Sequence, residues 1–161
     1  MKRWAARIIQ LVISVGLVLT IAECSVRKFA PQSLNVLLLR EDGVFSHVPG
    51  ADVIAHGLDT QAHVQINSDG LRDVERPRVK PPGVTRVLVL GDSMIEGLQV
   101  ELEETMPKQL EMRLSNAFPG KSFDVINAGV SGSTGPMASL YLERDGAALD
   151  PDLIVVTITT R

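Results

Sequence analysis

The chain has 161 residues, of which 45% are hydrophobic and 4% aromatic, and its formal charge at pH 7 is −3. This length allows one ordinary domain and argues against two. A slightly acidic chain without clustered Lys and Arg offers no electrostatic surface for nucleic acid, so we expect no nucleic-acid partner. Cys24 is the single cysteine, which excludes an internal disulfide and a cysteine zinc site.

The amino end has the pattern of a membrane-spanning segment. An uncharged apolar run over residues 8–22 is interrupted only by Gln10 and follows three basic residues, Lys2, Arg3 and Arg7. A spanning helix needs about 20 apolar residues, so residues 4–6 must extend the run while Arg7 reaches back to the interface. Because basic residues before such a run mark the cytoplasmic side, we expect everything after residue 28 to be exported.

Three fates of this segment are compatible with the sequence. Our first interpretation is an uncleaved signal-anchor over residues 1–28, which holds the rest of the chain on the periplasmic or extracellular side. A cleaved signal peptide is the second, because residues 20–22 form an imperfect small-residue site. Lipidation of Cys24 is the third, but Glu23 places a charge where lipoprotein signals have a small residue. We therefore interpret Cys24 as a thiol at the membrane interface without a task.

Residues 29–84 predict a loop-rich arm with short strands. At its start, over residues 29–40, the apolar stretch 34–39 indicates a juxtamembrane helix or a packing arm. Residues 63–66 alternate as a strand does. They lead into Asn67-Ser68-Asp69-Gly70, where Asp-Gly supplies the positive φ values of a tight turn.

The sequence pattern assigns no chemical role to two charged residues and three histidines of this arm. Arg72 and Asp73 indicate either an ion pair that ties the arm to the following domain or a solvated turn, since exposed pairs contribute little. We interpret the histidines as surface or turn residues; they are His47, His56 and His63. Their spacings of nine and seven residues match no common pattern of zinc ligands, so we expect no metal site.

From residue 85 to residue 161 the pattern alternates between strand and helix. Three short apolar runs predict buried strands, at residues 86–90, 123–126 and 153–158. Strands joined by single helices imply right-handed crossovers and a parallel sheet. The predicted fold class is therefore α/β, with a flavodoxin-like, three-layer parallel sheet behind the amino-terminal transmembrane helix.

Two helices are predicted between these strands. The first has Thr105 as its cap and Pro107 in its first turn, and its apolar face repeats every four residues, at Met106, Leu110, Leu114 and Phe118. The second is capped by Ser133 or Thr134, has Pro136 near its first turn and extends through Leu142. We interpret Ser131 and Ser133 as residues of the preceding loop or of this cap.

The third predicted strand bears on the extent of the chain. In a flavodoxin-like order the first strand lies between the second and the third, which leaves residues 153–158 as an apolar edge. Natural proteins avoid such edges, and a strand that is apolar throughout expects cover on both faces. We therefore expect the 161 residues to be the amino-terminal part of a longer protein.

Two glycine-containing loops follow the first two predicted strands. Gly91, Asp92 and Ser93 come directly after the first strand, at the sheet edge where active sites of parallel sheets form. A serine there can expose its hydroxyl while the following N–H groups face a developing oxyanion. We interpret Asp92 as a residue that binds local backbone N–H groups. In residues 127–132, after the second strand, glycine lets the backbone approach a ligand closely.

These loops resemble the SGNH, or GDSL, family of serine esterases and acyltransferases. The family's Gly-Asp-Ser block is matched by residues 91–93, and its glycine after strand two, often within Asn-Ala-Gly, is matched by residues 127–129. Similar bacterial members have an apolar anchor that ends in Ala-Glu, as at residues 22–23. They also carry an Asn-Ser-x-Gly-x-Arg-Asp stretch, which is matched here by Asn67, Ser68, Gly70, Arg72 and Asp73. The resemblance covers essentially the whole chain.

The resemblance implies a role for each matched residue of the two loops. Ser93 is the expected nucleophile, the turn at Gly91 and Asp92 supports it, and the N–H groups of Ser93 and Gly129 are two expected oxyanion-hole donors. The family's third donor, an asparagine after strand three, and its Asp-x-x-His block, which supplies the general base, are not among the 161 residues. Because a serine hydroxyl without a base is a poor nucleophile, we expect this fragment to be inactive alone.

The expected function is that of an exported, membrane-anchored serine ester hydrolase that works through an acyl-serine. Its expected substrate is a small-molecule or polysaccharide ester, such as an O-acyl group of a cell-envelope carbohydrate or lipid, by analogy with the family. The alternatives are an O-acyltransferase of the same fold, a non-catalytic anchored binding or scaffold module, and a flavodoxin-like nucleotide-binding domain. We expect no cofactor, and the oligomeric state is left open.

Overall fold

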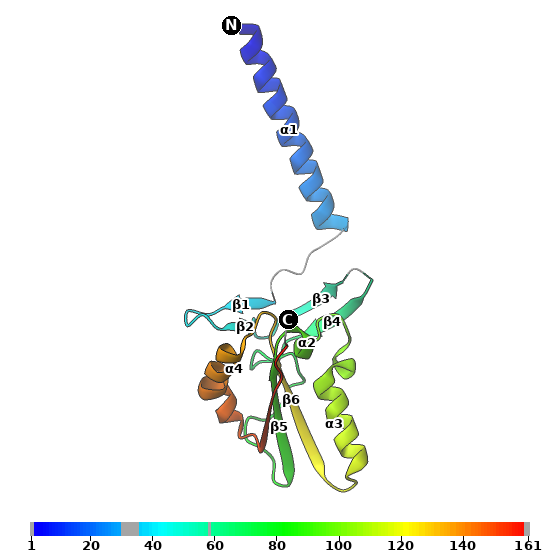
Figure 1. Ribbon diagram of the computed structural model, residues 1–161. Helices are drawn as coiled ribbons and strands as arrows, with labels where there is room; N and C mark the ends of the chain where they lie inside the picture. The colour runs from blue at the N-terminus through cyan, green and yellow to red at the C-terminus, as the bar shows by residue number, and fades with distance from the viewer. Residues whose placement is uncertain (1, 30–35, 58, 160–161) are drawn as a thin grey trace. The chain divides into compact units, whose positions relative to one another are not determined.

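The computed structural model describes residues 2–29, 36–57 and 59–159, which belong to two compact units, residues 1–32 and 33–161. The first unit is the helix α1 (Lys2–Phe29) (Figure 1). At about 1.5 Å per residue its 28 residues extend roughly 40 Å, more than the ~30 Å core of a bilayer. Residues 3–29 are long and apolar enough to cross a membrane, as predicted from the apolar run.

A three-stranded parallel sheet forms the centre of the second unit. It consists of β5 (Val84–Gly91), β6 (Ser122–Gly129) and β7 (Leu153–Val156), in the order β6-β5-β7. This confirms three parallel strands with the first in the centre. The third ends at Val156, two residues earlier than predicted, and β6 includes residues 127–129, which were predicted as a loop. The register places Gly91 opposite Gly129, so β5 and β6 end side by side.

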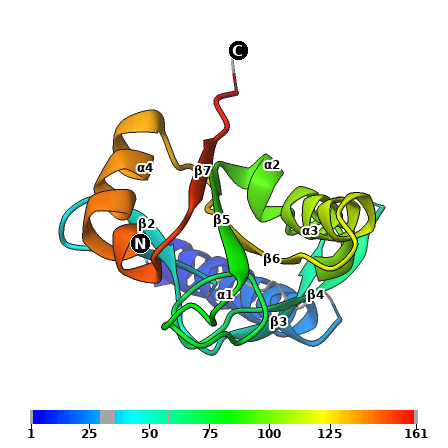
Figure 2. The same ribbon diagram turned by 90° about the horizontal axis from the view of Figure 1, so that it is seen from below.

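Both faces of the sheet are covered, because the apolar side chains of β5 alternate between two cores. Leu88 and Leu90 pack with Ala138 of α4 (Gly135–Tyr141), whereas Val87 and Val89 pack towards Leu110 of α3 (Met106–Ala117). Figures 1 and 2 show the two helices on opposite sides of the sheet. The run of apolar residues in β5 thus follows from burial on both faces.

Helix α3 begins and ends as predicted, but three details of the prediction are wrong. Leu110 and Leu114 pack on the sheet, while Met106 and Phe118 are 39% and 47% exposed. These two positions lie at or beyond the helix ends, where the four-residue repeat no longer faces the sheet. Thr105 occupies the N-cap position, but its hydroxyl donates to the Leu102 carbonyl at 2.7 Å instead of capping the helix.

Helix α4 is shorter than predicted, and the chain continues in tighter and wider turns. A π-helical turn, Leu142–Gly146, and a 3₁₀ turn, Ala147–Leu149, follow it before β7. Thr134 is at the N-cap of α4 with no capping hydrogen bond from its side chain, and a proline lies in the first turn as expected.

The arm forms two antiparallel hairpins. One pairs β1 (Leu37–Leu39) with β2 (Phe45–His47), and the other pairs β3 (Asp52–His56) with β4 (Gln61–Gln65). The helix predicted near residues 34–39 is therefore wrong where the structure describes it, because residues 37–39 pair as a strand; residues 34 and 35 lie outside the described part.

The predicted tight turn after β4 is present. The Asn67 side-chain oxygen accepts from the N–H groups of Asp69 and Leu71 at 3.0 and 2.9 Å, and Gly70 has φ 76°. Such a φ favours glycine, and the Asn side chain replaces a backbone acceptor in the turn. The expectation of a positive φ at Asp69 is wrong, because only Gly70 of the pair has one.

The sequence analysis expects a strand as apolar as β7 to be covered on both faces. In the structure β7 is instead an exposed edge strand. Among the described residues β7 pairs with β5 alone, and Leu153, Ile154 and Val156 are between 40% and 56% exposed. The strand is thus an apolar edge, the arrangement that its predicted place in the sheet implied.

Candidate active site

Ser93 is the first residue of a four-residue helix, α2 (Ser93–Glu96), that follows β5 directly. The side chain of Asp92, at the N-cap, accepts a hydrogen bond from the Met94 N–H at 2.9 Å. Its main-chain oxygen accepts from the N–H groups of Ile95 and Glu96, at 3.0 Å each. The interpretation that Asp92 binds local backbone N–H groups is thereby confirmed.

The exposed residue Ser93 lines a cavity of about 510 Å³ at the carboxyl end of the sheet. The walls come from residues 91–93, 132–135 and 156–159, with Ala138 of α4. Most of the polar side chains on them are hydroxyls: Ser93, Ser133, Thr134, Thr157 and Thr159. A volume in the range of about 300–1,000 Å³ suits a small ligand, so the cavity can hold a substrate beside the Ser93 hydroxyl.

Gly91 and Gly129, which face each other at the ends of β5 and β6, let α2 lie directly on the sheet. A Cβ at Gly91 would overlap the side chains of Ile95 and Thr157. A Cβ at Gly129 would overlap the Glu96 nitrogen and would lie 2.7 Å from the Ile95 carbonyl carbon. Close packing therefore gives both glycines a structural reason, independent of any catalytic role.

The structure brings Ser93 and Gly129 to the same edge of the sheet, but in different surroundings. Gly129 is buried, and the residues that line the cavity do not include it. Its N–H donates to the side-chain oxygen of Asn127 at 3.1 Å. A role for this N–H in an oxyanion hole stays a prediction, and it requires that a substrate oxygen replace Asn127.

The main-chain N–H of Ser93 is differently placed. The first N–H groups of a helix have no partner within the helix. Asp92 accepts the N–H groups of the next three residues, Met94, Ile95 and Glu96. The hydrogen bonds of residues 36–57 and 59–159 include no acceptor for the Ser93 N–H, and its role as an oxyanion donor stays a prediction.

Glu96, the last residue of α2, is a completely buried carboxylic acid that the sequence analysis missed. One of its oxygens lies 2.6 Å from Nε2 of His47, and the other accepts from the N–H of Ser131, at 2.6 Å, and from the Ser131 hydroxyl. It thus joins α2 to the arm and to the loop after β6. The sequence holds no signal for this role, because four residues show no apolar period and Glu is seldom fully buried.

His47 is not the surface or turn residue that we predicted. It lies in β2 with 1% of its surface exposed, and its Nδ1 is 3.1 Å from the Gly70 carbonyl. A buried histidine needs partners for both ring nitrogens, and Gly70 and Glu96 supply them. The other two histidines are exposed, as expected, and His63 pairs with Asp52 at 2.6 Å.

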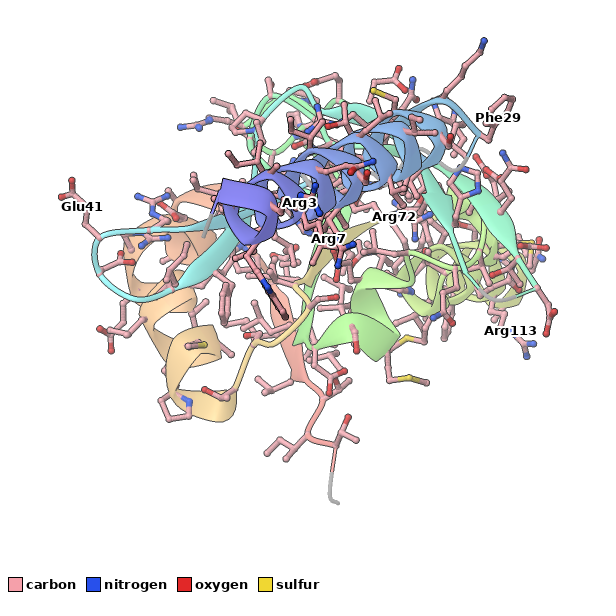
Figure 3. All side chains as sticks on the ribbon, turned by 90° about the horizontal axis from the view of Figure 1, so that it is seen from above. Arg3, Arg7, Phe29, Glu41, Arg72 and Arg113 are labelled. Carbon is pink, nitrogen blue, oxygen red and sulfur yellow. The ribbon has the colours of Figure 1, made fainter. Side chains whose placement is uncertain are left out.

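The interpretation of Arg72 as part of a solvated turn is wrong, because its guanidinium is buried against α2 (Figure 3). It donates to the carbonyl of Glu96 at 2.8 Å and to those of Gly97 and Val100. Burial lowers the pKa of Arg72 below its usual value, and nearby carboxylates, Glu96 first, oppose that shift. Arg72 therefore binds the carbonyl end of the helix whose other end carries Ser93.

Asp73 is also buried and ties the arm to the sheet domain, although its partner is not Arg72. Its carboxylate accepts the N–H of Asn127 at 2.9 Å and pairs with Lys108 at 2.8 Å and Arg76 at 2.9 Å. The arm is therefore attached to the sheet domain, as one interpretation predicted. Arg72 binds α2, and Asp73 binds β6 and α3.

None of the three histidines lines the Ser93 cavity, and Asp92 is its one ionisable side chain among the described residues. Within the same residues there is no group of three His, Cys, Asp or Glu side chains placed to hold a metal ion.

Comparison with known proteins gives no family: no family model matches the chain, and no curated protein matches it.

Proposed function

We propose that this chain carries the nucleophile of an exported, membrane-anchored serine ester hydrolase with a flavodoxin-like fold of the SGNH type. The observation that carries the proposal is the position of Ser93. Its hydroxyl is at the wall of a cavity, at the carboxyl end of a parallel sheet, on the first residue of a helix. Ligands of open parallel sheets bind at this edge.

In the proposed reaction the Ser93 oxygen attacks the carbonyl carbon of an ester. The carbonyl oxygen becomes an oxyanion, which the Ser93 N–H stabilises, joined by the Gly129 N–H once the oxyanion replaces Asn127 as its acceptor. Collapse of this intermediate breaks the bond to the alcohol, which leaves with a proton and gives an acyl-serine. Water then cleaves the acyl-serine to a carboxylic acid and restores the hydroxyl.

The attack needs a general base that takes the Ser93 proton and returns it to the leaving alcohol. Such a base contributes about 10²–10⁴-fold to the rate. The described cavity residues include no histidine, and the resemblance supplies the base through an Asp-x-x-His block that the 161 residues lack. Because the described cavity wall supplies no such base, we expect the 161-residue chain alone to hydrolyse esters poorly.

A fluorophosphonate probe tests the nucleophile on the protein as its gene encodes it. We expect labelling of Ser93 and its loss in Ser93→Ala. Ser133→Ala is the matched control, because Ser133 lines the same cavity and its loss should leave the labelling unchanged. Labelling that survives in Ser93→Ala would remove Ser93 as the nucleophile.

A non-catalytic binding module is the second candidate, favoured by the absence of a histidine from the described cavity wall. It predicts that small esters bind while the probe leaves Ser93 unmodified. An O-acyltransferase shares the acyl-serine with the hydrolase, and it differs by transferring the acyl group to a sugar hydroxyl faster than to water.

A further inference from the structure

Helix α2 cannot hold Ser93 in place by itself. Isolated helices shorter than about 12 residues are marginal in water, and α2 has four. The position of the Ser93 hydroxyl therefore depends on what fixes α2 from outside. Gly91 and Gly129 let the helix rest on the sheet, and Arg72 binds its carbonyl end.

The carboxyl group of Glu96 attaches α2 to two other segments of the chain. Both of its oxygens are engaged, one by His47 from the arm and the other by the N–H and hydroxyl of Ser131. Glu96 and His47 have completely buried side chains, and Ser131 belongs to the loop that leads to the cavity residues 132–135. One carboxyl group thus connects α2 to the loop that leads into the cavity residues 132–135.

The hydrogen bonds determine how many protons Glu96 and His47 hold together. A carbonyl oxygen only accepts, so Nδ1 of His47 carries the hydrogen that it donates to Gly70. The 2.6 Å separation between Nε2 and the Glu96 oxygen then needs one shared proton. The pair is either imidazole with carboxylic acid or imidazolium with carboxylate, and it is neutral overall in both forms. The cation Arg72 donates to the Glu96 carbonyl at 2.8 Å.

We propose that Glu96 and His47 are positioning residues for Ser93: their buried pair holds α2 and the Ser131 loop at the separation that the reaction needs. This inference rests on the proposed function of Ser93. Supporting residues behind a nucleophile set its geometry, and a displacement of about 1 Å can reduce a rate 10²-fold.

Substitutions of Glu96 separate geometry from charge. In Glu96→Gln the amide oxygen accepts from Ser131 and the amide NH₂ donates to neutral imidazole, so every hydrogen bond can be kept. We expect a probe-labelling rate at Ser93 within about threefold of the natural protein. Glu96→Asp keeps the carboxyl group but is one methylene too short to reach both partners. We expect it, like Glu96→Ala, to label about 10- to 100-fold more slowly.

His63 provides the matched control. It pairs with Asp52 at 2.6 Å, the same separation as the buried pair, but both side chains are about half exposed and lie on the β3–β4 hairpin. We expect His63→Gln to label at the natural rate. Labelling rates are divided by the folded fraction of each variant, measured by circular dichroism at the same temperature. A rate in Glu96→Ala that falls only as the folded fraction falls would overturn the positioning role, and so would Glu96→Gln reacting as slowly as Glu96→Ala.

If the probe does not label Ser93 of the natural protein, the proposed function is overturned. Hydrogen exchange then still tests the positioning role of Glu96. The N–H groups of Ile95 and Glu96 donate to Asp92, and that of Gly97 donates to Ser93. If Glu96 holds α2 in place, Glu96→Ala speeds exchange at these three amides at least about tenfold, while His63→Gln does not. Unchanged exchange at all three would overturn the positioning role on its own.

Discussion

The carboxylate of Asp73 accepts a hydrogen bond from the main-chain N–H of Asn127 at 2.9 Å, across 54 residues of sequence. Asn127 lies in β6, two residues before the glycine on which α2 rests. Asp73 belongs to the arm, so the arm is bound to the strand that supports the candidate site. Arg72 and His47 make comparable attachments to α2. The arm is therefore part of the structure that holds the site.

Asp73→Asn tests the energy of this attachment. The substitution leaves Lys108 and Arg76 beside a neutral amide in a buried place, so we expect a loss of about 3 kcal/mol in the free energy of unfolding. Urea unfolding followed by circular dichroism measures it. Asp150→Asn is the control, because Asp150 is 74% exposed beside Lys80 and its φ of 52° suits asparagine; we expect a change within about 0.5 kcal/mol. Equal losses in the two variants would contradict the buried role of Asp73.

Gly129→Ala tests the close packing of α2 on β6. The added methyl group would overlap the Glu96 nitrogen and the backbone of Ile95, which cannot move as a flexible side chain does. We expect a loss of about 1–3 kcal/mol in stability together with displacement of α2. Gly135→Ala is the control, since its methyl group would meet nothing within 4 Å and alanine favours the helix. Thermal unfolding of both variants gives the comparison, and a Gly129→Ala protein as stable as the natural one would refute the packing argument.

The ionised carboxylate of Asp152 contributes to the free energy of unfolding, and we expect this contribution to be lost in acid. Its hydrogen bond to Lys80, followed by the N–H of Arg86, lowers its pKa below 3.8, while Asp152 in turn raises the pKa of Lys80 above 10.5. A lowered carboxyl pKa contributes stability above the unfolded value, and this contribution is lost as the pH falls through the folded value. The Lys80 contribution is complete below 10.5 and is lost as the pH rises through its folded value.

We therefore expect Asp152→Asn to unfold at lower urea concentration than the natural protein at neutral pH and to lose less stability below about pH 4. Urea midpoints measured between pH 2 and 8 show both effects. Because the pair is at the surface, added salt should narrow the difference between the two proteins. Parallel acid limbs in the two proteins would contradict the assignment.

The orientation of α1 is tested by a reporter fused after residue 32, where the first compact unit ends. We expect alkaline phosphatase activity, which requires export, because basic residues before an apolar helix stay in the cytoplasm. Exchanging these residues for glutamate, as Lys2→Glu, Arg3→Glu and Arg7→Glu, should lower the activity. An inactive phosphatase with the natural sequence would reverse the topology that we propose.

The sheet and its order were predictable because their signals are local. The apolar run from residue 86 to 90, and those of β6 and β7, are short, end at turn residues and alternate with helical patterns, so strand type and direction follow. The β1–β2 hairpin was not predictable in this way, since residues 37–39 form a strand through pairing with residues 45–47. An apolar stretch of that length fits a helix equally well.

The place of Ser93 at the sheet edge was predictable from its motif, while most of the buried contacts of its helix were not. Ser93 stands out because Gly-Asp-Ser follows a buried strand. Glu96, His47 and Arg72 are charged or polar residues that are ordinarily exposed, and their burial depends on partners 24 to 49 residues away. The sequence indicated that Arg72 ties the arm to the following domain, but local patterns reveal neither its partners on α2 nor the Glu96–His47 pair.

Buried charged and polar pairs join the arm to the sheet domain, with one partner in each part. Detaching the arm would leave Glu96 without His47 and would separate Asp73 from Lys108, and all four side chains are buried or nearly so. Such half-broken states are costly, so residues 33–161 should lose their structure in one cooperative transition. The Ser93 cavity would then persist until the whole unit melts, with no earlier loosening of the arm.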